Sequence, residues 1–143
     1  MRHLSRRAAL ALHEATHATV AMKMGLTVAW VSIDQGYDEG VNFMAAVKIP
    51  DESIDMERDR EAICVAMAAP SFVITDDEEM DRYARAEASL AFTVAGQHGI
   101  RPHEVYEEAA RLAADLYPEI GDLADRLALE GRVVFERQSA DGS

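Results

Sequence analysis

The stretch His-Glu-Ala-Thr-His, residues 13–17, lies inside an apolar run that covers residues 4–25. Residues four positions apart face the same side of a helix, so the imidazoles of His13 and His17 can reach a single ion. Glu14 points roughly a quarter-turn away from His13 and can hold a water bound to that ion, as a metal-assisted hydrolase requires. The spacing therefore predicts a metal-binding helix in which Glu14 is the general base.

The residues that surround the motif are almost all apolar, which predicts that this helix is buried. They are Ala8, Ala9, Leu10, Ala11, Leu12, Ala15, Ala18, Val20 and Ala21. Two imidazoles and a carboxylate without partners would be costly to desolvate in such a helix, and a bound metal ion removes that cost. The competing interpretation is a helix that carries two histidines by coincidence.

The chain of 143 residues is long enough for one domain, which we expect to cover residues 1–138, with a disordered tail at residues 139–143. A net charge of −12 and a pI near 4.7 argue against nucleic acid and anionic membranes as direct partners. The sequence contains no stretch that approaches the length of a membrane span. The single cysteine, Cys64, lies in an apolar run, which predicts a packing role and a reduced, cytoplasmic compartment.

The order of elements predicts a mainly α-helical α+β fold. Ser5 and Gly25 are the expected ends of the first helix. Residues 27–33 and 41–49 are rich in β-branched and aromatic side chains, which predicts two strands of a small hairpin or sheet. Residues 34–40 contain two glycines and are the expected turn.

About four further helices are expected after the strands. The first covers residues 61–69 and is stopped by Pro70. Thr75 or Asp76 is the expected N-cap of a long helix that ends near residue 97. The last two cover residues 102–117 and 120–137.

A zinc ion held by two histidines needs a third protein ligand if one position is to stay open for water. The acidic cluster within residues 75–81, which leads into the long helix, is one supply of carboxylates. Within them, Asp81 precedes a stripe of alanines that could bring that face close to the first helix. Glu87, further along the same helix, is a competing donor.

The motif and the elements that follow it resemble the peptidase domain of FtsH-type zinc proteases. In that family a HEAGH helix is followed by a strand, a turn and a Gly-Val pair; the corresponding residues here are His13–His17, Val31-Ser32-Ile33 and Gly40-Val41. The likeness is close before Pro50 and rests on the order of the elements beyond it. One departure is Phe72, which stands where the family has a glutamate.

The resemblance implies a zinc metallopeptidase that hydrolyses peptide bonds with a zinc-bound water activated by Glu14. The family takes its third zinc ligand from an aspartate at the start of the long helix. This implies Asp81 as the partner of His13 and His17, with Asp77 and Glu78 as alternatives.

Proteases of this family also carry membrane helices and an ATPase module, and this sequence shows neither, nor a GxxxxGK[ST] loop. We therefore expect peptide or unfolded protein substrates, a delivery partner or a homo-oligomer. An extended substrate could pair with the exposed edge of the hairpin strand. The competing functions are a non-catalytic binding or regulatory protein of the same fold and an unrelated HExxH metallopeptidase.

Overall fold

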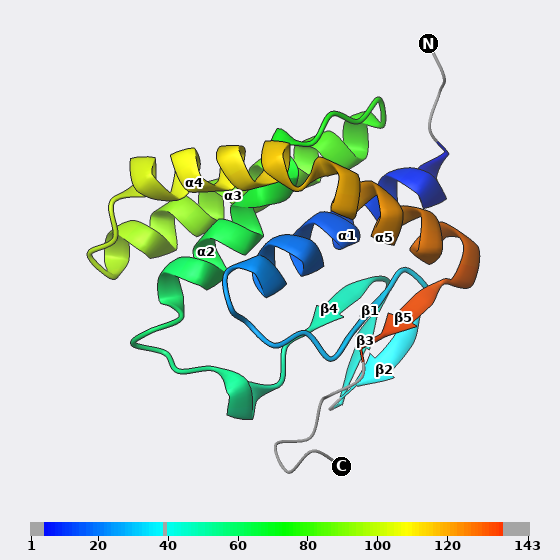
Figure 1. Ribbon diagram of the computed structural model, residues 1–143, viewed down its shortest axis with the longest axis horizontal. Coiled ribbons are helices and arrows are strands. Elements are labelled where there is room, and N and C mark those ends of the chain that lie inside the picture. Colours follow the sequence, from blue (N-terminus) through cyan, green and yellow to red (C-terminus); the bar gives the residue numbers. More distant parts are fainter. Residues whose placement is uncertain (1–4, 39, 136–143) are drawn as a thin grey trace.

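The first helix, α1 (Arg6–Lys23), runs through the centre of the computed structural model, which describes residues 5–38 and 40–135 (Figure 1). Ser5 caps its N-terminus, because the serine hydroxyl accepts a hydrogen bond from the backbone N–H of Ala8 at 3.0 Å. Beyond its other end Gly25 has φ 91°, a left-handed conformation in which glycine meets no steric penalty. Both predicted ends of the helix are confirmed.

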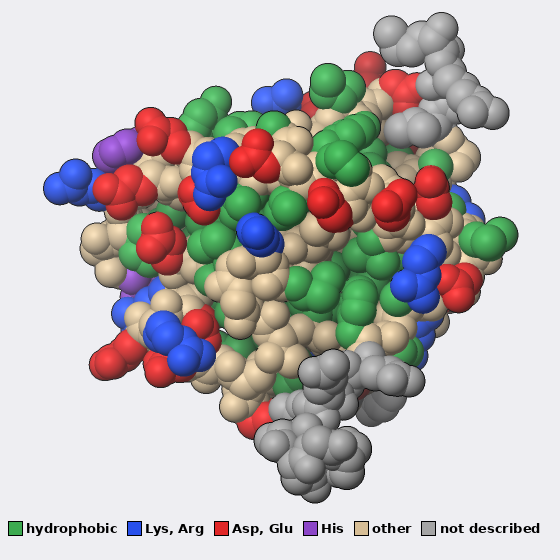
Figure 2. All heavy atoms as spheres, in the orientation of Figure 1, with side chains coloured by type: hydrophobic (Ala, Val, Ile, Leu, Met, Phe, Trp, Pro, Cys, Tyr) green, Lys and Arg blue, Asp and Glu red, His purple; other side chains and the backbone are tan. Residues whose placement is uncertain are grey.

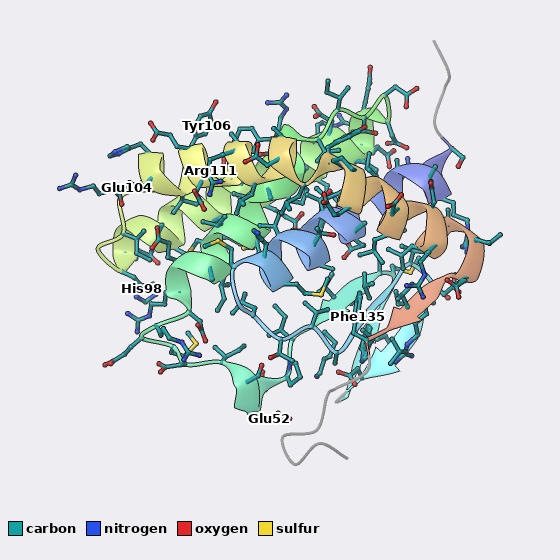
Figure 3. The ribbon with its side chains drawn as sticks, in the orientation of Figure 1. Glu52, His98, Glu104, Tyr106, Arg111 and Phe135 are labelled. Carbon is teal, nitrogen blue, oxygen red and sulfur yellow. The ribbon has the colours of Figure 1, made fainter. Side chains whose placement is uncertain are left out.

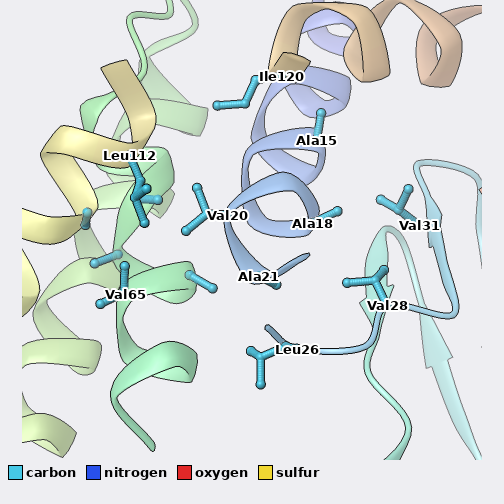
Figure 4. Packing of buried hydrophobic residues seen from close by; sticks show 14 of the residues in the cluster. Ala15, Ala18, Val20, Ala21, Leu26, Val28, Val31, Val65, Leu112 and Ile120 are labelled. Atoms are coloured by element: carbon cyan, nitrogen blue, oxygen red, sulfur yellow. The ribbon is translucent and has the colours of Figure 1, made fainter. Parts of the chain in front are cut away.

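Helix α1 is buried on several sides because much of its surface consists of small side chains. Ala15, Ala18 and Val20 are each 0% exposed. Two helices, α2 (Arg60–Ala68) and α5 (Tyr117–Glu130), pack against its flanks (Figures 1 and 4). Small side chains let helix axes approach closely, and the core combines the alanines of α1 with larger side chains of its neighbours, such as Val65 and Ile120.

A three-stranded antiparallel sheet lies beside α1 in the order β4-β1-β5. Its strands are β1 (Trp30–Ser32), β4 (Ala46–Lys48) and β5 (Arg132–Val134). In the centre of the sheet Val31 is paired with Val47 on one side and with Val133 on the other. The two strands predicted from the sequence therefore pair with each other, but β1 has no open edge for a substrate because β5 covers its second side.

Two predictions about these connections were wrong. The expected turn at residues 34–40 contains β2 (Gly36–Asp38), which forms a separate hairpin with β3 (Val41–Phe43). The last helix was expected to continue to residue 137, but it ends at Glu130, where Gly131 adopts φ 80°. A glycine in this conformation ends a helix, and the next three residues, which include Val133 and Val134, form β5.

The remaining helices follow the predicted order. A short 3-10 helix, η1 (Asp51–Ser53), precedes α2, and η2 (Ala69–Phe72) continues it past Pro70. The long helix α3 (Glu78–Gln97) ends as predicted, but its N-cap is Asp77, whose carboxylate accepts from the N–H of Met80 at 3.0 Å. Helix α4 (Pro102–Asp115) begins at its predicted proline. Helix α5 begins three residues earlier than expected, because Pro118 is accommodated in its first turn.

The fold is a mainly helical α+β fold with a small sheet, as predicted. On the face drawn in Figure 2, acidic and basic side chains are interspersed, with apolar groups between them. Within the described ranges, no helix combines the length and the apolar character needed to cross a bilayer. The predicted tail and residues 136–138 of the predicted domain lie outside the described residues.

Candidate metal centre

The two histidines of the motif both lie on α1, and their imidazoles point toward one common site. The Nε2 atoms of His13 and His17 lie 3.1 Å apart, and their ring centroids are separated by 4.7 Å. His13 is buried with 5% of its surface exposed. The predicted convergence of the imidazoles on one site is confirmed.

Glu87 of α3 brings a carboxylate to the same place. One carboxylate oxygen, Oε1, lies 2.7 Å from Nε2 of His13, and the other lies 3.4 Å from Nε2 of His17. The ligating atoms of the three residues all lie within 4.8 Å of one another. The competing donor considered from the sequence is thus the carboxylate that the structure places beside the imidazoles.

The structure places the three other proposed ligands elsewhere. Asp81 accepts a hydrogen bond from Nε of Arg85 at 2.9 Å, and its side chain is 38% exposed. Asp77 caps α3 and lies 3.4 Å from the guanidinium of Arg6. Glu78 lies in the exposed first turn of α3. None of these carboxylates belongs to the group formed by the two imidazoles within the described part of the chain.

The helical repeat places Asp81 and Glu87 on opposite flanks of the alanine stripe of α3. The predicted alanine stripe is buried: Ala84, Ala88 and Ala91 are 4%, 5% and 0% exposed. At about 100° per residue, Asp81 and Glu87 lie about 60° to either side of Ala84. Both residues therefore flank the stripe, and the sequence alone does not say which flank turns toward the histidines. The packing of α3 against α1 and α2 selects the flank that carries Glu87.

His17 is held from its other side by α2. Its Nδ1 lies 2.8 Å from the carbonyl oxygen of Ala66. A carbonyl oxygen can only accept, so Nδ1 carries a proton, and in the neutral ring Nε2 then keeps its lone pair for the shared site. Such a partner behind a metal-binding histidine orients the ring.

The carboxylates and the imidazoles of the site favour each other's charged forms. Burial opposes ionisation of Glu87, but the hydrogen bonds that His13 and His17 donate when their rings are protonated outweigh burial and lower the pKa of Glu87 to about 2. Burial also opposes protonation of His17, yet the hydrogen bond with Glu87 and the negative charge of Glu14 raise the pKa of His17 above its ordinary value. The pocket therefore favours positive charge at the point where the imidazoles and the carboxylate meet.

The donor set fits a zinc ion. Two ligands at 2.0–2.1 Å from a tetrahedral zinc lie roughly 3.3 Å apart. The separations of 3.1 Å between the imidazole nitrogens and 3.4 Å between His17 and Glu87 are close to this value. The 2.7 Å between His13 and Glu87 is shorter and would have to open slightly. Two histidines and one glutamate are also a known ligand set of catalytic zinc sites, in which one position stays open.

Glu14 does not belong to this group of ligands but lies beside it. Its side chain borders a cavity of about 400 Å³, together with Leu10, Met44, Met80 and Tyr83. Glu14 is 7% exposed, and its burial raises the pKa of the carboxyl although the nearby imidazoles lower it. The predicted general base thus stands between the candidate metal ligands and a space open to a substrate.

Other residues considered from the sequence lie away from this site. Cys64 is buried with 3% exposure, in the packing position predicted for it. His98 lies at the C-terminal end of α3 (Figure 3). It does not join the candidate ligands, and neither does His103, among the residues that the structure describes.

Comparisons with protein-family models, with curated proteins and with solved structures found no match to this chain. A functional proposal therefore depends on the chemistry of the site and on the resemblance of its motif.

Proposed function

We propose that the protein is a zinc-dependent metallopeptidase of the FtsH-peptidase type, with His13, His17 and Glu87 as zinc ligands and Glu14 as general base. One observation carries the proposal: two imidazole nitrogens and a carboxylate converge in a partly buried site, and a second carboxylate lies beside them at the edge of a cavity. This arrangement sets a group of ligands beside a carboxylate that borders a cavity, which a purely structural zinc site does not need.

In this proposal a bound zinc ion activates the reacting groups, and Glu14 transfers the proton. A zinc ion bound there would polarise the scissile carbonyl and make a water more acidic. Glu14 accepts the proton of the attacking water and then donates it to the leaving amine. Burial raises the pKa of Glu14, which makes the protonated carboxyl easier to form during this transfer.

The cavity beside Glu14 suggests the path of the substrate. Met44 and Ala45 line it, and they directly precede β4, an edge strand of the three-stranded sheet. We therefore assign the expected pairing of an extended substrate with the edge of a hairpin strand to β4, since β1 is paired on both sides. A peptide that pairs with β4 would lead past Met44 and Ala45 to the cavity, with its backbone near Glu14.

The substitution Glu14→Gln tests the proposal. It removes the base but no ligand, so we expect unchanged zinc content and a loss of peptide cleavage of about 10²–10⁴-fold. Glu104→Gln, on α4 (Figure 3), is the matched control for the loss of one carboxylate and should cleave like the wild type.

Two results would overturn the proposed activity. One is a Glu14→Gln protein that cleaves peptides at the wild-type rate. The other is a zinc-loaded wild-type protein that cleaves no peptide or unfolded protein, which would favour a binding protein with a structural ion.

A further inference from the structure

Tyr83 occupies a position between the candidate ligands and the cavity. It lies on α3 four residues before Glu87, so both side chains lie on neighbouring parts of one helix face. Its ring is tilted by 44° against the ring of His13, with 5.4 Å between the centroids. The same side chain lines the cavity that Glu14 borders.

The phenol hydroxyl is available to a ligand in this cavity. Tyr83 is 56% exposed, so much of its side chain is not covered by the rest of the protein. A phenol has an ordinary pKa near 10 and therefore keeps its proton at neutral pH. It can donate a hydrogen bond without carrying a charge of its own.

The other donor on this cavity is already engaged. The guanidinium of Arg6 lies 2.8 Å from Glu79 and 3.4 Å from Asp77, so it bridges two acidic residues near the start of α3. Among the side chains that line the cavity, only Tyr83 carries a hydroxyl group. Tyr83 is thus a neutral donor on this cavity whose ring also lies against one imidazole of the pair.

We propose that Tyr83 is a catalytic residue that donates a hydrogen bond to the oxygen of the scissile carbonyl while this oxygen becomes negative. The inference rests on the proposed peptidase function and extends it. A donor held in place where charge develops stabilises the transition state more than the ground state. Tyr83 therefore acts on the rate of the chemical step and has little part in binding the substrate.

The electrons and protons of the step balance without a further reactant. The water oxygen bonds to the carbonyl carbon, the π pair moves to the carbonyl oxygen, and Glu14 takes the released proton. In the second half the carbonyl re-forms, the C–N bond breaks and the amine nitrogen receives the proton from Glu14. Tyr83 keeps its proton throughout and only donates a hydrogen bond.

Tyr83→Phe is the decisive variant because it removes only the hydroxyl and keeps the ring against His13. Tyr106→Phe is the matched control, since Tyr106 is 52% exposed and lies on α4, where its ring packs against Phe72 (Figure 3). The quantities to measure for each variant are its zinc content and its kcat and KM with a peptide substrate. The Kd of a phosphinic peptide is a further readout, because its tetrahedral anionic group resembles the transition state.

For Tyr83→Phe we expect unchanged zinc content and KM, and a kcat lower by about 10²–10³-fold. The Kd for the phosphinic peptide should rise at least tenfold, while Tyr106→Phe should behave like the wild type. A Tyr83→Phe protein with wild-type kcat and phosphinic-peptide affinity overturns the inference, as does one that loses zinc.

The binding measurement separates this inference from the proposed function. If the wild type binds the phosphinic peptide but cleaves nothing, the proposed activity fails. A weaker affinity of Tyr83→Phe would then still support the hydrogen bond from Tyr83. If the wild type cleaves peptides and Tyr83→Phe does so equally well, the activity stands and the role of Tyr83 is refuted.

Discussion

The carbonyl oxygen of Ala66 lies 2.8 Å from Nδ1 of His17, so a backbone group of α2 determines which nitrogen of an α1 imidazole carries the proton. In free histidine the two neutral tautomers are close in energy, and the partner of one nitrogen decides the state of the other. The site is therefore prepared for an ion by a contact between two helices.

This contact predicts the tautomer of His17. In the metal-free protein, at a pH above the raised pKa of His17 where its imidazole is neutral, nitrogen-15 spectra should show a protonated Nδ1 and an unprotonated Nε2 for His17. The imidazole of exposed His98 serves as the internal comparison for an unconstrained ring. A His17 with its proton on Nε2 would contradict the structure.

Glu87 and Asp81 differ in their expected effect on zinc affinity. Glu87→Gln replaces a charged ligand by a neutral amide, so zinc affinity should fall by more than the roughly 10- to 100-fold typical of groups behind the ligands. Asp81→Asn removes only the pair with Arg85 and should leave affinity unchanged. Competition with a zinc chelator gives both values. A steeper loss in Asp81→Asn would restore Asp81 as the ligand.

Gly131 and Gly121 should respond in opposite directions to alanine. Gly131 has φ 80°, and a Cβ there would collide with the carboxylate of Asp34. We expect Gly131→Ala to lower the free energy of unfolding by about 1–2 kcal/mol.

Gly121 is the control, because it lies inside α5 and a Cβ there meets no atom within 4 Å. Gly121→Ala should raise stability by about 0.5–1 kcal/mol. Urea unfolding measures both, and a shift of the same sign in the two variants would contradict the assigned end of α5.

The lowered pKa of Asp59, a residue away from the candidate metal centre, predicts that the stability of the fold depends on pH. Its carboxylate accepts hydrogen bonds from Arg58 and from the N–H of Asp55, which hold the pKa of Asp59 below its ordinary 3.8. A lowered pKa in the folded state means that ionised Asp59 stabilises the fold above about pH 3.8 and that this contribution disappears as the pH falls through the folded value.

Asp59→Asn should therefore be less stable than the wild type at pH 7, and the difference should shrink below pH 4. Asp125→Asn, at an exposed position of α5, corrects for the loss of one negative charge from a chain of net charge −12. Thermal unfolding between pH 2.5 and 7 checks the trend. A difference that stays constant over this range would show that the carboxylate of Asp59 is not the source.

Local chemistry was sufficient to predict much of the molecule. The spacing of His13 and His17 placed both rings on one side of a helix, since this depends only on the helical repeat. Ser5 and Gly25 marked the ends of that helix through hydrogen bonding and backbone freedom, which are also local. Gly131, followed by Arg132 and two valines, is a local signal of the same kind for the end of α5 and the start of β5.

Tertiary packing decided what these local rules leave open. Asp81 and Glu87 flank the same alanine stripe, and the rotation of α3 in its packed position brings Glu87, not Asp81, to His13. The pairing of β5 with β1 joins residues about a hundred positions apart, and no local pattern specifies such a pair. The sequence by itself determined which groups stand on each element, while the rotation and position of each element, set by close packing of small side chains, determined which groups meet.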